Sequence, residues 1–134
     1  MTESAESRKL SEALRECGAE CISIVASMMQ QAGLPDRLVV SLNPRWIGFI
    51  EAKRGSGDVT LKQAIVHERF VARGCPVMIA RYWDTPQGSI VKLACSRGRK
   101  GEWGEGEARV NDGKQILAEC FSLTALAKEH GIWI

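Results

Sequence analysis

The order of apolar segments along residues 1–83 restricts this chain to a small set of folds. Apolar side chains recur at helical spacing over residues 6–17 and again over 60–73. Four other segments are rich in β-branched or apolar residues, as strands are, and they cover 20–26, 36–42, 46–53 and 76–83. The order helix, three strands, helix, strand predicts an α/β fold, in which a helical crossover joins strands of one mixed sheet.

The rest of the chain, residues 84–134, has a weaker pattern. We expect a strand over 89–96, a polar glycine-rich loop over 97–106, short strands over 107–110 and 116–121, and a short final helix over 123–130. A length of 134 residues fits a single domain, 1–134. Within it we expect a core of about 5–83 and a C-terminal β-rich extension of about 84–134.

Charge and cysteine content exclude some classes of protein and leave others open. The net charge of +2 neither requires nor excludes a nucleic-acid partner. No run approaches the ~18 apolar residues of a membrane span, and residues 1–9 contain no apolar signal segment. We therefore expect a cytoplasmic protein with no membrane partner. The odd number of cysteines favours reduced thiols, and Cys17 and Cys21 lack a second ligand pair at zinc-site spacing.

Two carboxylates are expected to meet at one end of the second and third strands. Asn43-Pro44 is a turn signal that makes these strands an antiparallel hairpin. Asp36 then lies beside Glu51, and Lys53 shares the face of Glu51 because side chains alternate along a strand. Two adjacent carboxylates repel unless a cation joins them, and oxygen ligands favour Mg²⁺ or Mn²⁺. Alternatively, Glu51 and Lys53 are exposed edge residues, and Asp36 merely follows a proline in a turn.

Polar side chains on the two predicted helices supply further candidates. Gln63, His67 and Phe70 share one helical face because of their spacing. Alternatively, Gln63 is a solvated helix residue and His67 a satisfied polar group on that face. Glu6 lies on the apolar stripe of the first helix, where a carboxylate needs a partner. The alternative is that Glu6 occupies the first turn, where negative charge suits the helix dipole.

These residues resemble a known nuclease pattern. Pro35-Asp36 and Glu51-Ala52-Lys53 match the two halves of the PD-(D/E)xK motif. The wider segment, with GLPDRLV, GFIEAK, the glutamine of the next helix, HERF and RG, is similar to the virus-type replication-repair nuclease (VRR-NUC) domain. The resemblance covers roughly residues 1–83, and residues 84–134 match nothing in it.

The resemblance implies a restriction-endonuclease-like αβββαβ core, with a mixed sheet flanked by helices, and metal-dependent hydrolysis of phosphodiester bonds. The site residues that it implies are Asp36, Glu51 and the backbone carbonyl of Ala52 as ligands of Mg²⁺ or Mn²⁺, and Lys53 and Gln63 as catalytic residues. A further metal-binding glutamate of the family lies on the first helix. Glu6 is the nearest match to it, and Ser7 is the alternative occupant of that position.

The function expected from this resemblance is that of a structure-specific DNA endonuclease, similar to the Holliday-junction resolvases of phage or bacterial replication and repair. An alternative is a catalytically weak DNA-binding or scaffold module that keeps the nuclease fold. A related nuclease with another role, such as end processing or restriction, is a second alternative, and a generic α/β domain with an accidental motif is a third. The complete set of Asp36, Glu51 and Lys53 argues against the weak module, because an inactive enzyme need not keep all three.

Two features outside the motif bear on partners. Arg97, Arg99 and Lys100 cluster in a glycine-rich loop, where they either contact DNA phosphates or are solvated loop charges. A junction with two-fold symmetry needs two cuts, so we expect a homodimer. Apolar residues without an evident place in the core would form its surface if exposed together, or pack over the C-terminal segment: Met28, Met29, Trp83 and 132–134.

Overall fold

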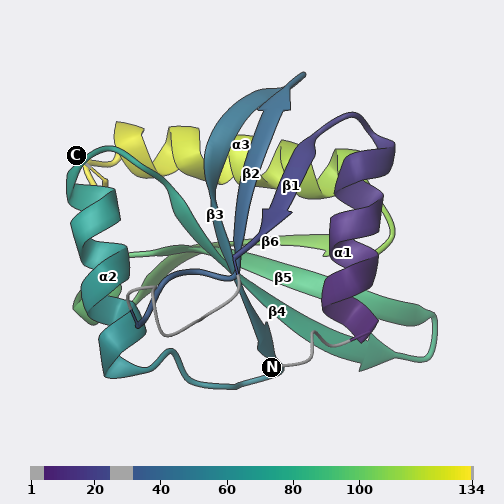
Figure 1. Cartoon of the computed structure of the whole chain (residues 1–134), viewed down its shortest axis with the longest axis horizontal. Helices are drawn as coiled ribbons and strands as arrows, with labels where there is room; N and C mark the ends of the chain where they lie inside the picture. Colours follow the sequence, from purple (N-terminus) through teal and green to yellow (C-terminus); the bar gives the residue numbers. More distant parts are fainter. Residues whose placement is uncertain (1–4, 25–31, 134) are drawn as a thin grey trace.

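The computed structural model describes residues 5–24 and 32–133 (Figure 1). Its elements are α1 (Ala5–Glu16), β1 (Glu20–Ser23), β2 (Arg37–Leu42), β3 (Arg45–Arg54), α2 (Leu61–Ala72), β4 (Val77–Thr85), β5 (Gly88–Ser96), a 3₁₀ turn η1 (Gly98–Lys100), β6 (Glu102–Arg109) and α3 (Gly113–Glu129). The predicted α/β class is confirmed. The bounds of the first two helices and of β2 to β5 lie close to those predicted, whereas the predicted strand over 20–26 extends to residues outside the described part.

The six strands form one mixed sheet in the order β1-β2-β3-β4-β5-β6. Neighbouring strands are antiparallel except for β3 and β4, which are parallel. This single parallel pair follows from α2, because only a crossover can return the chain to the edge where β3 began. The predicted hairpin of β2 and β3 is confirmed, with Arg37 opposite Ile50 and Leu42 opposite Arg45.

The helices cover both faces of the sheet (Figure 1). Trp46 of β3 donates its Nε1–H to the Thr124 hydroxyl of α3 at 2.9 Å, which places α3 on the face of the even-numbered β3 residues. Phe49 stacks on Phe70 of α2 at 4.9 Å between ring centroids, which places α2 on the opposite face. The main core lies on the α1 and α3 side and includes Leu10, Leu14, Ile50, Ile116, Leu117 and Cys120.

The predicted short strand over 116–121 is wrong. These residues belong to α3, a continuous helix that begins after Asp112, whose side chain accepts a hydrogen bond from the Gln115 N–H. Buried residues recur along α3 at helical spacing, at positions 116, 117, 120, 123, 124 and 127. A period near 3.6 therefore governs the segment, and its apolar residues cover the sheet instead of extending it.

Much of the predicted polar loop over 97–106 is also wrong, because β6 starts at Glu102 and pairs with β5. β6 is the last strand of the sheet in the part of the chain that the structure describes, so one of its edges is not paired with another strand. Charged side chains are common on such edge strands because they prevent pairing with other chains. The segment after β4 is thus two strands of the same sheet and one covering helix, so it is less β-rich than predicted.

Of the apolar residues expected either to form a surface or to pack over the C-terminal segment, the structure describes Trp83, Ile132 and Trp133. Trp133 is buried and donates its Nε1–H to the Ser96 carbonyl at 2.9 Å, so it packs over the C-terminal segment. Trp83 is partly exposed, with the Lys92 ammonium 5.5 Å from its ring centroid. Met28, Met29 and Ile134 lie outside the described residues. Among the helices of the described part, none is long and apolar enough to cross a membrane.

Candidate active site

The hairpin brings Asp36 and Glu51 together at one end of β2 and β3. Since Arg37 lies opposite Ile50, the residue before Arg37 lies beside the residue after Ile50. Asp36 Oδ2 accepts a hydrogen bond of 2.7 Å from the Ala52 N–H, which turns its carboxylate toward β3. Glu51 is almost fully buried, whereas the Asp36 side chain keeps 26% of its surface exposed. The expected carboxylate pair is therefore present, with solvent access on the Asp36 side.

The pair is electrostatically unfavourable in the absence of a cation. Burial, followed by the neighbouring Glu51 carboxylate, raises the pKa of Asp36 from 3.8 to about 6. Arg37 lies behind the pair and is itself buried, with Nη1 3.8 Å from Asp36 Oδ2 and Nε donating to the Ser11 hydroxyl of α1 at 2.8 Å. Burial lowers the pKa of Arg37. A guanidinium on the core side thus offsets part of the negative charge.

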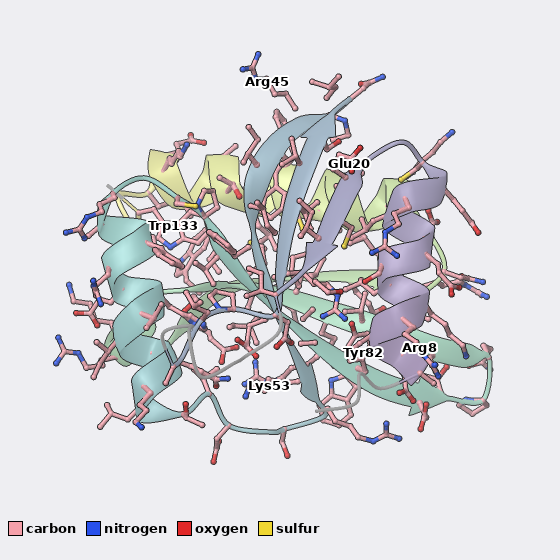
Figure 2. All side chains as sticks on the ribbon, in the orientation of Figure 1. Arg8, Glu20, Arg45, Lys53, Tyr82 and Trp133 are labelled. Carbon is pink, nitrogen blue, oxygen red and sulfur yellow. The ribbon has the colours of Figure 1, made fainter. Side chains whose placement is uncertain are left out.

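Lys53 and Gln63 complete the cluster on the α2 side. Lys53 Nζ donates to Gln63 Oε1 at 2.8 Å and lies 3.9 Å from Glu51 Oε2. Because the Gln63 oxygen accepts from Lys53, its amide N–H faces Glu51, where it donates to Oε2 at 3.3 Å. In Figure 2 the labelled Lys53 lies in the open area between α2 and α1. Gln63 thereby orients both the lysine and the glutamate.

The start of α2 fixes the position of Gln63. Thr60 accepts from the Gln63 backbone N–H, and Gln63 Oε1 accepts from the Thr60 N–H at 3.0 Å, which is a capping box. The pattern Thr-x-x-Gln is visible in the sequence and marks this helix start. This pattern is the local signal in the sequence that ties Gln63 to a defined place.

His67 is the residue whose contacts the sequence did not reveal. It lies one turn after Gln63 and is completely buried, with Nε2 3.7 Å from Glu51 Oε1 and Nδ1 2.9 Å from the Ser96 hydroxyl. Within the described residues, neither His67 Nε2 nor Glu51 Oε1 has a hydrogen-bond partner. A buried polar atom without a partner costs about 1–3 kcal/mol. The expected face was correct, but a satisfied polar role does not describe this side chain.

Glu6 lies apart from the carboxylate pair. Its Oε1 is 3.1 Å from Nη1 of Arg54, and a hydrogen bond to its own backbone N–H, followed by the one to Arg54, lowers the pKa of Glu6. Over residues 5–24 and 32–133, no three His, Cys, Asp or Glu side chains gather as a metal-binding group. The structure therefore gives Glu6 a partner other than a metal, and its role as a ligand stays a prediction.

The remaining donors of the site fit a hard divalent cation. Asp36 and Glu51 present adjacent carboxylates, and Glu51 Oε1 is free of any described hydrogen bond. A cation shared between them would offset both the burial of the Asp36 carboxylate and its repulsion by Glu51, which together raise the Asp36 pKa. Oxygen donors of this kind select Mg²⁺ or Mn²⁺ over softer metals.

The basic residues after β5 form an ordered turn against α2. Arg99 donates from its backbone N–H, Nε and Nη2 to the Glu68 carboxylate at 3.0 to 3.1 Å. These hydrogen bonds lower the pKa of Glu68 to about 2. Lys100 is exposed and Arg97 is partly buried. The charge of Arg99 is thus locally neutralised, and the turn does not have the form of a flexible basic finger.

A cavity of about 420 Å³ lies between this turn, the start of α2 and β4. Arg81, the β4 partner of Lys53 in the sheet register, lines it and donates Nη2 to the Gly57 carbonyl at 3.0 Å. Leu61, Arg99 and Glu102 also line it. The cavity is therefore close to Lys53 and carries both signs of charge.

No protein-family model matches the chain, and no curated protein matches it. The resemblance to the nuclease family therefore rests on the motif and on the arrangement of its residues.

Proposed function

We propose that this protein is a metal-dependent deoxyribonuclease of the PD-(D/E)xK type, with a restriction-endonuclease-like core and a C-terminal extension formed by β5, β6 and α3. The observation that supports the proposal is the convergence of Asp36, Glu51, Lys53 and Gln63 from β2, β3 and α2. A chance match to a short motif gives no reason for a glutamine on a separate helix to contact both the glutamate and the lysine of that motif.

The roles of the residues follow from their chemistry. Asp36, Glu51 and the Ala52 carbonyl would hold Mg²⁺ or Mn²⁺, which supplies positive charge to a phosphodiester and a more acidic bound water. Lys53 places an ammonium beside the carboxylates, where it stabilises negative charge that builds on a phosphate oxygen. Gln63 keeps Lys53 Nζ in place through a 2.8 Å hydrogen bond. Arg37 holds Asp36 from the core side.

We propose DNA with branches or junctions as the substrate, and a homodimer as the form that makes two opposed cuts. Support for a dimer comes from the sheet face that α2 leaves open near β1, β2 and β3. Ile22, Leu42 and Ile47 lie on this face with 51%, 85% and 49% of their surface exposed. Light scattering tests the dimer. A mass near 14.7 kDa, both alone and on junction DNA after subtraction of the DNA, would contradict it.

One cleavage assay tests the proposed activity. Labelled four-way junction, flap, duplex and single-stranded DNA are incubated with Mg²⁺, Mn²⁺ or EDTA. We expect cleavage of branched DNA with either metal and none in EDTA. Glu51→Gln should abolish cleavage and leave folding intact, whereas the matched control Glu105→Gln, at an exposed position on β6, should cut normally.

Two results would contradict the nuclease proposal. Cleavage at full rate in EDTA would show that the carboxylates do not act through a metal. Binding of branched DNA by the wild type without cleavage under any metal condition would favour the catalytically weak binding module.

A further inference from the structure

His67 is fully buried at the centre of the α2 contact with β3. It lies between Gln63, which contacts Glu51 and Lys53, and Phe70, which stacks on Phe49. These flanking contacts align α2 with β3 on both sides of the imidazole. Each ring nitrogen therefore faces a defined atom: Nδ1 faces the Ser96 hydroxyl at 2.9 Å, and Nε2 faces Glu51 Oε1 at 3.7 Å.

The groups that face the two ring nitrogens favour a proton on Nε2, because the Glu51 carboxylate can only accept a hydrogen bond, whereas the Ser96 hydroxyl can either donate or accept. The Ser96 hydroxyl oxygen accepts from the Gly98 N–H at 3.2 Å, and its own proton can be donated to His67 Nδ1, which lies 2.9 Å away. A neutral imidazole that accepts at Nδ1 carries its proton on Nε2. The Nε2–H then faces Glu51 Oε1, the carboxylate oxygen that no other described group contacts by a hydrogen bond.

We propose that His67 is a positioning residue for Glu51, in the Nε2-protonated form that the Glu51 carboxylate favours and the Ser96 hydroxyl accommodates. Each oxygen of the Glu51 carboxylate then faces an N–H group of α2: Gln63 donates to Oε2 at 3.3 Å, and the His67 Nε2–H is directed at Oε1 across 3.7 Å. The hydrogen bond from Gln63 and the electrostatic contact with His67 together restrict the plane of the carboxylate, so its remaining lone pairs keep one direction toward a cation shared with Asp36. The consequence for metal binding rests on the proposed nuclease function, whereas the contact itself does not.

An apolar packing role would not require this arrangement. A leucine could fill a buried site of this kind without leaving an N–H beside a carboxylate. Outer hydrogen-bond partners that orient a metal ligand affect metal affinity or activity by about 10- to 100-fold. The effect of His67 should therefore appear in metal binding as well as in stability.

Two substitutions separate the two nitrogens. His67→Gln places an amide N–H where Nε2 lies and can reach Glu51. His67→Asn is the matched control, because its shorter amide replaces Nδ1, reaches Ser96 and leaves Glu51 without its donor. We expect Mn²⁺ affinity, measured by electron paramagnetic resonance of free Mn²⁺, to fall about tenfold in His67→Asn and to stay within about threefold of wild type in His67→Gln. Thermal unfolding checks that both variants are folded.

A second measurement uses the wild type alone, so it does not depend on the folding of any variant. Imidazole ¹⁵N shifts report the protonated nitrogen, and His130→Gln assigns the signals because the chain has two histidines. We expect protonation at Nε2 of His67. Protonation at Nδ1, or equal Mn²⁺ affinity of His67→Asn and wild type, would overturn the proposal. Wild type that neither binds Mn²⁺ nor cuts DNA would instead overturn the nuclease function, and the ¹⁵N shifts would still decide the contact.

Discussion

Replacing Asp36 with asparagine should remove the proposed activity and make the metal-free protein more stable. Asn Oδ1 can accept the same hydrogen bond from the Ala52 N–H that Asp36 accepts at 2.7 Å. The substitution therefore keeps the geometry and removes one negative charge beside Glu51. The loss of activity and the gain of stability have one cause: two adjacent carboxylates can bind a cation, but they repel each other when no cation is bound.

The size of the effect comes from the pKa of Asp36, which burial and Glu51 raise from 3.8 to about 6. A shift of about two units corresponds to about 3 kcal/mol. The partial exposure of the side chain, 26%, lets solvent screen the charge and reduces this figure to about 2 kcal/mol. We therefore expect Asp36→Asn to raise the free energy of unfolding by about 2 kcal/mol at pH 8 in EDTA.

The sign of the pH dependence distinguishes this cause from a general change in packing. A carboxyl whose folded-state pKa is raised binds protons more tightly in the folded protein, so its protonation favours folding. The wild type should lose this stability as the pH rises from about 4 to about 7, whereas Asp36→Asn should not. The difference in the free energy of unfolding between the two proteins should thus be small at pH 4 and reach its largest value by pH 8.

Urea unfolding at several pH values, followed by tryptophan fluorescence, measures this difference. The control is Asp84→Asn, because Asp84 is exposed and its removal should change stability by less than about 0.5 kcal/mol. Added Mg²⁺ should stabilise the wild type and not Asp36→Asn, since a ligand that binds only the folded state raises its stability. An Asp36→Asn protein that is less stable than wild type at pH 8, or a difference that does not change with pH, would refute the reasoning.

Three further outcomes are expected. Lys53→Ala should reduce the rate of single-turnover cleavage by ~100-fold or more and reduce DNA affinity much less, because the Lys53 ammonium acts mainly on charge that develops in the transition state. Equal losses of rate and affinity would make Lys53 an ordinary phosphate contact. Gly33→Ala should lower the free energy of unfolding by about 2 kcal/mol, because Gly33 has φ +91° and an added Cβ would overlap the α2 backbone. An unchanged midpoint in urea titrations would contradict this. Lys100→Ala should reduce the slope of log affinity against log salt concentration for DNA binding by about one. Arg99→Ala should change this slope little, because Glu68 neutralises the charge of Arg99. An equal change of slope in the two variants would contradict the role of the ion pair.

The sequence predicted the centre of the fold because its signals there are local. A turn at Asn43-Pro44 between two β-rich segments determines an antiparallel hairpin, and the alternation of side chains then places Asp36 beside Glu51 and Lys53 on the face of Glu51. The sequence signals for the start and end of α2 are likewise local. In these cases the physical cause acts within a few residues of its effect.

The C-terminal part could not be predicted in the same way, because its signals depend on partners far along the chain. Residues 116–121 contain enough apolar side chains for a strand, and only the full period of α3 shows that they face a sheet. The polar composition of β6 resembles a loop, yet the strand forms because β5 offers an unpaired edge. Backbone pairing with an existing strand can override weak local preference.

By itself, the sequence determined the α/β class, the hairpin and the residue types of the candidate site. Only the tertiary structure decided the partners of those residues: His67 against Glu51, Arg37 buried behind Asp36, and Glu68 holding Arg99. Except for the adjacent Arg37 and Asp36, these contacts join residues separated by at least 16 positions. They form because α2 lies across β3 and beside η1, and because α1 closes the core side over Arg37. Packing of these layers brings each charged group to its partner and buries it, and burial depends on the assembled layers instead of on any short stretch of sequence.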